Sequence, residues 1–89
     1  MRAIVTVIGK DRVGIIADVC TLLASCGVNV LDINQTVLQE YFTMMMLVDT
    51  SGCSISFDEM SKTLKSKGES FALSIRIQRE DIFEAMHRI

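Results

Sequence analysis

Residues Gly9–Ala17 read GKDRVGIIA and separate two apolar segments of different periodicity. Before them, residues 2–9 alternate and are rich in β-branched side chains, which predicts a strand. After them, helical spacing predicts a helix over residues 12–26, with an inward stripe of Ile16, Val19, Cys20, Leu23 and Cys26. Two glycines bound the connecting loop, and glycine permits sharp bends and close approach of the backbone. Because the first amides of a helix are unpaired and partly positive, we predict that this corner can hold a small carboxylate or phosphate.

Size and charge exclude several classes of function. The chain has 89 residues, of which 49% are apolar, and a net charge of −2. Such a length predicts one domain, residues 1–89, that buries only about 60% of its unfolded surface, so part of the apolar surface is expected to meet a partner. The acidic balance argues against nucleic acid. No apolar run reaches the ~20 residues of a membrane span, and the N-terminus is unlike a signal peptide, so we expect a cytoplasmic protein without a membrane partner.

The cysteines and the single histidine do not form a metal-binding pattern. Cys20 and Cys26 lie six residues apart on different sides of the expected helix, Cys53 is in a loop, and no CxxC motif is present. We expect reduced thiols in or near the core, and neither metal nor cofactor. His87, next to a C-terminal arginine, is expected to complement a helix dipole.

The remaining pattern predicts a βαββαβ order with a short helix added at the end. Gly27 ends the first helix, and Ser56 opens the second through a capping box that extends to Glu59. The other expected bounds are strands over 28–39, 41–49 and 71–78, a second helix ending at Gly68, and a C-terminal helix over 79–89. The core is therefore residues 1–78. The last helix presents one apolar side, formed by Ile82, Phe83, Met86 and Ile89.

This order predicts an α+β, ferredoxin-like sandwich with sheet order 4-1-3-2 and both main helices on one face. The first and third strands, at the centre, are apolar on both faces, and two helices cover only one of them. An open patch of that kind is unusual on a monomer. The candidates to cover it are the C-terminal helix, from its own chain or a partner, and a second subunit.

Several residues admit two interpretations. Residues 44–46, three consecutive methionines, favour core packing over a soft-metal site, because strand alternation points the middle one away from the others. Asp32, Asn34 and Gln35 interrupt an apolar strand, so they either lie on a solvated edge or face a ligand or a partner. Asp11 either caps the first helix or contacts a ligand.

The loop and the following strand suggest further ligand contacts. Arg12 either pairs with an anion or extends into water. A glycine in the first turn of a helix, such as Gly14, destabilises the helix by up to about 1 kcal/mol relative to alanine. Close approach of a ligand or a partner strand would explain why a glycine is present there. Asn29 is expected at the same end of the sheet as the loop, with an amide suited to a zwitterion.

The chain resembles an ACT domain, a small-molecule-sensing module of amino-acid metabolism. The resemblance rests on residues 9–17, on Gly27–Ile33 (GVNVLDI) and on the βαββαβ order, and it covers the whole chain. Gln35–Val37, Tyr41–Met44 and the C-terminal extension are similar to a group of small, free-standing bacterial and archaeal ACT proteins. One departure is Val13, where many ACT loops have proline.

The resemblance implies a regulatory module, not an enzyme, that binds an amino acid between two subunits of a homodimer and acts through a regulated enzyme or regulator protein. Backbone amides around Arg12–Ile15 would hold the ligand carboxylate, Gly14 would leave room, and Asn29 would meet the ammonium or carboxylate group. The combined candidate ligand-binding residues are Asp11, Arg12, Val13, Gly14, Ile15, Asn29, Asp32 and Asn34.

Two other functions compete with this reading. One is a protein-interaction or dimerisation module without a small ligand, which uses the apolar sheet face. The other is an acylphosphatase-like enzyme, a class with the same fold that uses an arginine and an asparagine. Arg12 and Asn29 superficially match these two residues. The loop of that class is absent, and no catalytic triad or paired carboxylates accompany the match.

Overall fold

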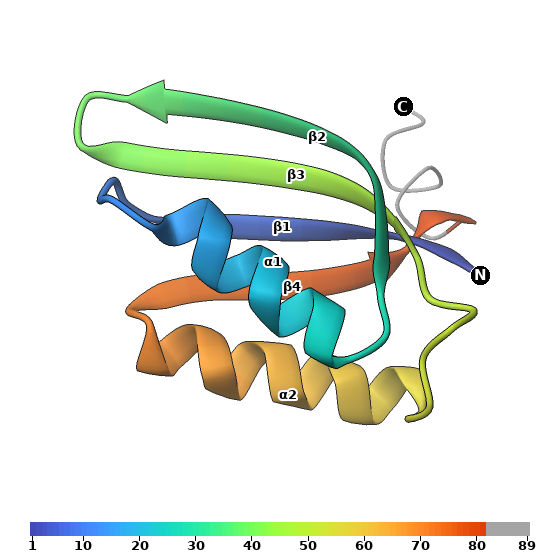
Figure 1. Ribbon diagram of the computed structural model, residues 1–89. Coiled ribbons are helices and arrows are strands. Elements are labelled where there is room, and N and C mark those ends of the chain that lie inside the picture. Colours follow the sequence, from blue (N-terminus) through green and yellow to red (C-terminus); the bar gives the residue numbers. More distant parts are fainter. Residues whose placement is uncertain (82–89) are drawn as a thin grey trace.

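The computed structural model describes residues 1–81 and has the expected βαββαβ order (Figure 1). The elements are β1 (Arg2–Lys10), α1 (Ile15–Ser25), β2 (Asn29–Leu38), β3 (Tyr41–Asp49), α2 (Phe57–Ser70) and β4 (Leu73–Arg79). The antiparallel sheet has the order β2-β3-β1-β4, and α1 and α2 lie on one of its faces. The ferredoxin-like α+β prediction and its sheet order are confirmed. The helix expected over residues 79–89 lies, beyond Asp81, outside the described residues.

Strand alternation places the core between the sheet and the helices. Ala3, Val5 and Val7 of β1 are fully buried, and Val5 pairs with Met46 of β3 on one side and Ile77 of β4 on the other. Met44 and Met46 are likewise buried in the core, whereas Met45 points to the opposite face. The core-packing interpretation of the two outer methionines is therefore confirmed.

Helix α1 begins three residues later than expected, and its buried stripe differs from the predicted one. Gly14 has φ 92° and ψ 0°, a left-handed conformation that cannot belong to the helix. The stripe that faces the sheet consists of Ile15, Val19, Leu22 and Leu23. Ile16, predicted to face inward, is 39% exposed, and Cys20 is only half-buried. The predicted helix end is confirmed, since Gly27 follows α1 with φ 77°.

Helix α2 starts as predicted but ends later. The Glu59 backbone N–H donates to the Ser56 side-chain oxygen, 3.1 Å away, so the capping residue is confirmed. The prediction that Gly68 ends α2 was wrong, because the helix continues to Ser70. Gly68 is instead buried against β4: a Cβ atom there would lie 2.8 Å from Ile75 Cγ1 and 3.0 Å from the Leu73 carbonyl oxygen. A glycine thus lets helix and strand approach closely.

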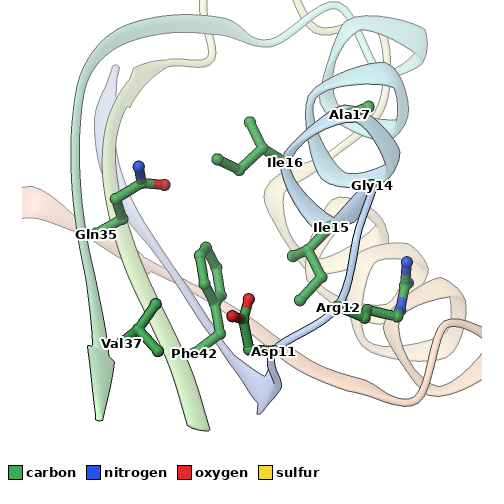
Figure 2. A pocket seen from close by; sticks show the side chains of 9 residues that line it. All are labelled: Asp11, Arg12, Gly14, Ile15, Ile16, Ala17, Gln35, Val37 and Phe42. Carbon is green, nitrogen blue, oxygen red and sulfur yellow. The ribbon is translucent and has the colours of Figure 1, made fainter. Parts of the chain in front are cut away.

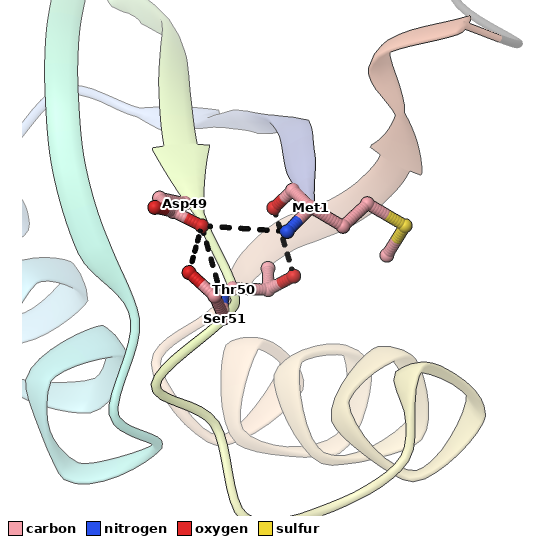
Figure 3. A network of polar contacts seen from close by, with 4 residues as sticks. All are labelled: Met1, Asp49, Thr50 and Ser51. Atoms are coloured by element: carbon pink, nitrogen blue, oxygen red, sulfur yellow. Dashed lines mark hydrogen bonds and ion pairs between the residues drawn. The ribbon is translucent and has the colours of Figure 1, made fainter.

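At the far end of β1 and β3, a polar network joins the two strands (Figure 3). The backbone N–H and hydroxyl of Ser51 donate to Asp49 Oδ1 at 3.0 and 2.6 Å, and the Met1 ammonium lies 3.5 Å from the same oxygen. The backbone N–H and hydroxyl of Thr50 donate to the Met1 carbonyl at 2.8 and 3.0 Å. The hydrogen bonds from Ser51, assisted by the nearby ammonium, lower the pKa of Asp49.

Among residues 1–81, no helix has the length and apolar character needed to cross a membrane. Within the same residues, no cluster of three or more histidine, cysteine or acidic side chains is arranged to hold a metal ion.

The packing of Gly68 predicts the effect of enlarging it. Alanine normally stabilises a helix interior by about 1 kcal/mol relative to glycine, but overpacking a core contact costs about 1–3 kcal/mol. We therefore expect Gly68→Ala to lower the free energy of unfolding, and Gly68→Leu to lower it further. Urea unfolding measures the change, with Ser66→Ala on the exposed side of α2 as the control. A gain in stability for Gly68→Ala would contradict the close contact with Ile75.

The lowered pKa of Asp49 predicts a pH dependence. A carboxyl group whose pKa is depressed in the folded chain stabilises the fold above its unfolded value, close to 3.8, and this contribution disappears as the pH falls through the folded value. We expect Asp49→Asn and Ser51→Ala each to flatten the acid-side loss of stability. Urea unfolding between about pH 7 and pH 2 tests this. The remote variant Glu69→Gln serves as the control, and equal slopes for Asp49→Asn and the wild type would refute the assignment.

Candidate functional site

A groove of about 440 Å³ lies between the start of α1 and the end of β2 (Figure 2). This volume is within the range of small-molecule sites. Figure 2 shows Ile16, Gln35 and Val37 pointing from opposite sides into the groove, with Phe42 between them. The lining residues come from the β1–α1 loop, the first turn of α1, and strands β2 and β3: Asp11, Arg12, Gly14, Ile15, Ile16, Ala17, Gln35, Val37 and Phe42.

One end of the groove is the uncapped start of α1. The first helical hydrogen bond runs from the Asp18 backbone N–H to the Gly14 carbonyl, 2.9 Å away. The amides of Ile15, Ile16 and Ala17 precede this first donor and therefore have no acceptor within the helix. No side chain in the described residues caps this end, so the interpretation of Asp11 as a helix cap was wrong. The groove thus ends on free amides with partial positive charge.

The walls of the groove are apolar because β2 extends beyond the helices. Val37 pairs with Phe42 and Gln35 pairs with Met44, so both β2 residues point to the helix side of the sheet. Since β2 is the edge strand, α1 does not bury them, and Val37 is 52% exposed. Ile16 faces them from α1. An exposed apolar wall opposite helix amides can accept an amphipathic ligand that carries an anionic group.

Asp11 adds a negative charge to this groove. Its backbone N–H donates to the Glu40 carbonyl, 2.7 Å away, which ties the loop to the β2–β3 hairpin. Its carboxylate lies beside Phe42 at the mouth of the groove (Figure 2). The groove therefore combines a carboxylate with the positive end of a helix, an arrangement complementary to a zwitterion.

Arg12 does not point into the groove. Its Nη2 lies 3.0 Å from Asp18 Oδ2 and donates to the Phe71 carbonyl, 3.4 Å away. Figure 2 shows the side chain directed away from Ile16 and Gln35. Arg12 therefore connects the β1–α1 loop to the end of α2.

Of the predicted residues, Asp11, Arg12, Gly14 and Ile15 line the groove, and four others do not. Val13, next to them in sequence, points outward and is 99% exposed. Asn29, Asp32 and Asn34 lie elsewhere on β2.

The prediction that Asn29 lies at the loop end of the sheet was wrong. Asn29 pairs with Asp49, which also pairs with Arg2 at the start of β1. Strands β1 and β2 are both antiparallel to β3, so they run in the same direction and Asn29 lies at the opposite end from the loop. The distance along β2 from Asn29 to Val37 is about 26 Å. Arg12 and Asn29 therefore do not meet, and the acylphosphatase-like reading has no support in the geometry.

A β-bulge explains why Asp32 and Asn34 face away from the groove. The register between β2 and β3 shifts between Val30 and Asp32, which reverses the alternation that follows. Asp32 and Asn34 pair with Leu47 and Met45 on the face opposite the helices. Gln35 and Val37 face the groove instead. Facing a ligand was one of the two interpretations of Gln35, whereas Val37 was not proposed as a ligand contact. Recognising the bulge at Leu31 would have placed both on the groove side.

The comparisons with known proteins agree with this fold. A family model described as "ACT domain" matches residues 2–78. A UPF0237 protein of Clostridium acetobutylicum is 54% identical over 89 residues, which covers 100% of each chain. A UPF0237 protein of Listeria monocytogenes is 51% identical, also over 100% of each chain.

A solved structure of an ACT domain protein has the same fold. An ACT domain protein from Streptococcus pneumoniae matches with a TM-score of 0.83 and 44% identity, over 94% of each chain. The sequence resemblance is therefore confirmed, and the chain belongs to the ACT domain family.

Proposed function

We propose that this chain is a regulatory module that binds a free amino acid in the groove between α1 and β2. ACT domains are regulatory modules, and the family assignment supports a sensing role in preference to catalysis. The observation that carries the proposal is the glycine-initiated, uncapped start of α1, which opens onto an apolar groove with Asp11 at its mouth. The expectations of a cytoplasmic location and of a non-enzymatic role belong to the same proposal.

The groove favours an amino acid with an apolar side chain. The ligand carboxylate binds the amides of Ile15–Ala17, where free N–H groups and the helix dipole both stabilise an anion. Its ammonium group pairs with Asp11. Its side chain packs against Val37 and Phe42, which with Ile16 form the apolar wall.

A second copy of the chain is the natural partner for β2. Within residues 1–81 this ten-residue strand has β3 as its only neighbour, so its outer backbone groups are available for pairing. Two-fold antiparallel pairing of β2 with β2 places the start of one strand beside the end of the other. With the axis at Ile33, Asn29 of the second copy comes opposite Val37. This dimer brings Asn29 of the second copy to the end of the sheet at which the groove lies, although on the face opposite the helices.

Linkage between binding and dimerisation supplies the regulatory output. A ligand that binds only the dimer stabilises it by RT ln(1 + [L]/Kd), about 2.7 kcal/mol at a hundredfold excess over Kd. A regulated enzyme or regulator protein that recognises the dimer can then respond to the amino-acid concentration.

The competing function is a protein-interaction module without a small ligand. The observation in its favour is the apolar surface on the sheet face away from the helices, where Ile8 and Tyr41 are exposed. The two functions differ in their response to free amino acids.

Thermal unfolding with each of the twenty amino acids tests the proposed ligand. We expect at least one apolar amino acid to raise Tm, by about 4–8 °C for each kcal/mol of binding-linked stabilisation. Gly14→Leu should abolish the rise, because leucine does not readily adopt the φ of 92° on which the position of the helix amides depends. Gel filtration with and without the amino acid measures the dimer in parallel.

Two neighbouring residues of β2 provide a matched pair for this test. Gln35 faces the groove and Asn34 faces the opposite side, so Gln35→Ala should reduce the Tm shift and Asn34→Ala should preserve it. Asp11→Asn should also reduce the shift without introducing backbone strain. A panel in which no amino acid changes Tm while the dimer persists would overturn the ligand and favour the interaction module.

A further inference from the structure

The face of the sheet opposite the helices carries an apolar centre with polar edges. On this face, strands β1 and β3 contribute mainly apolar residues, with Thr6 and Thr43 among them, while β2 and β4 contribute mainly polar ones. We call these central residues the open sheet face: Ile4, Ile8, Tyr41, Met45 and Leu47. An apolar centre within a polar rim is the composition of a buried contact surface.

The apolar centre extends to the end of the sheet at which β4 ends, close to the last described residue. Ile4 pairs with Leu47 on β3 and with Gln78 on β4, and Met45 lies one level further along. Gln78 immediately precedes Arg79, the last residue of β4. The chain therefore leaves the sheet next to the pair formed by Ile4 and Leu47.

An ion pair holds the exit of the chain at this position. Arg2 Nη2 lies 2.9 Å from Glu80 Oε2, which links the residue after β4 to the start of β1. Arg79 Nη2 lies 2.9 Å from Asp81 Oδ2. Exposed ion pairs contribute little stability, but the Arg2–Glu80 pair places Glu80 beside the start of β1.

The sequence of residues 82–89, IFEAMHRI, complements the open sheet face. Ile82, Phe83, Met86 and Ile89 recur at the spacing of one helix side. Nine residues in helical conformation, the number from Asp81 to the last residue of the sequence, span about 13 Å. The distance from β4 across β1 and β3 to β2 is about 14 Å. The segment therefore has the length and the apolar side needed to cross the central strands.

We propose that residues 82–89 bind the open sheet face of their own chain, with Phe83 and Met86 against Ile4, Met45 and Leu47. A tethered segment meets its site at an effective concentration in the millimolar range, which an untethered second copy does not reach. The open sheet face is thus an intramolecular docking surface. This inference is independent of the groove and of its ligand.

Disulfide trapping in the full chain tests the contact. In a variant whose three cysteines are replaced by alanine, we introduce Met45→Cys together with Met86→Cys. The control combines Met86→Cys with Thr21→Cys, an exposed position of α1 on the helix side. Mild oxidation should give a several-fold higher yield of intrachain disulfide for the first pair, measured by non-reducing mass spectrometry. Equal yields for both pairs, or a disulfide between chains, would overturn the proposal.

A second measurement needs no added cysteine. We expect Phe83→Ser to increase binding of the dye anilinonaphthalene sulfonate and to lower Tm, because it uncovers Met45 and Leu47. Glu84→Gln, on the opposite side of the predicted helix from the apolar residues, should change neither. The effects of Phe83→Ala and Met45→Ala on the free energy of unfolding should be non-additive, since contacting residues are coupled. Additive effects would show that the two side chains do not meet.

Discussion

The left-handed turn at Gly14 is the constraint on which the site depends. The chain must pass from the central strand β1 to a helix on one face of the sheet, and it does so at a residue with φ 92°. A non-glycine residue pays roughly 1–2 kcal/mol for this conformation. Because the turn ends at Gly14, the helix starts at Ile15, which enters the core, while Ile16 faces the groove. The same turn leaves the first amides of α1 without a side-chain cap. The φ angle of Gly14 therefore determines both the partial positive charge at one end of the groove and the position of Ile16 in its apolar wall.

The edge strand β2 supplies the rest of the groove. A helix pair can cover the central strands of such a sheet while the outermost strand projects beyond it, as Figure 1 shows for β2. Gln35 and Val37 then remain accessible although they point to the helix side. The groove is therefore built from side chains that the core does not use, which is how a small domain can present a binding surface without opening its core.

The parts of the structure that follow from the periodicity of apolar residues were predictable from the sequence. The parts that depend on a local irregularity, where the alternation of a strand shifts by one residue, were not. Alternation placed Val5, Met44 and Ile77 on the buried face, and the handedness of crossovers gave the sheet order. By contrast, the bulge after Val30 turns Asp32 to the face opposite the helices and Gln35 to the helix side. No residue type in that stretch predicts the bulge. Gly68 shows a different limit. In the sequence it looks like a helix end, and only the contact with Ile75 reveals a packing role.

Strand β2 also provides a physical link between the two faces of the molecule. Its residues alternate between the groove, with Gln35 and Val37, and the opposite side, with Asp32 and Asn34. An edge strand held by one neighbour is among the elements that open most easily, so a ligand that joins it to α1 reduces its motion as a whole. Because the backbone of a strand moves as one unit, side chains on the opposite side are ordered by the same event. Under the proposed function, occupancy of the groove would therefore change a surface that the ligand does not touch, as a module whose output is carried by another protein requires.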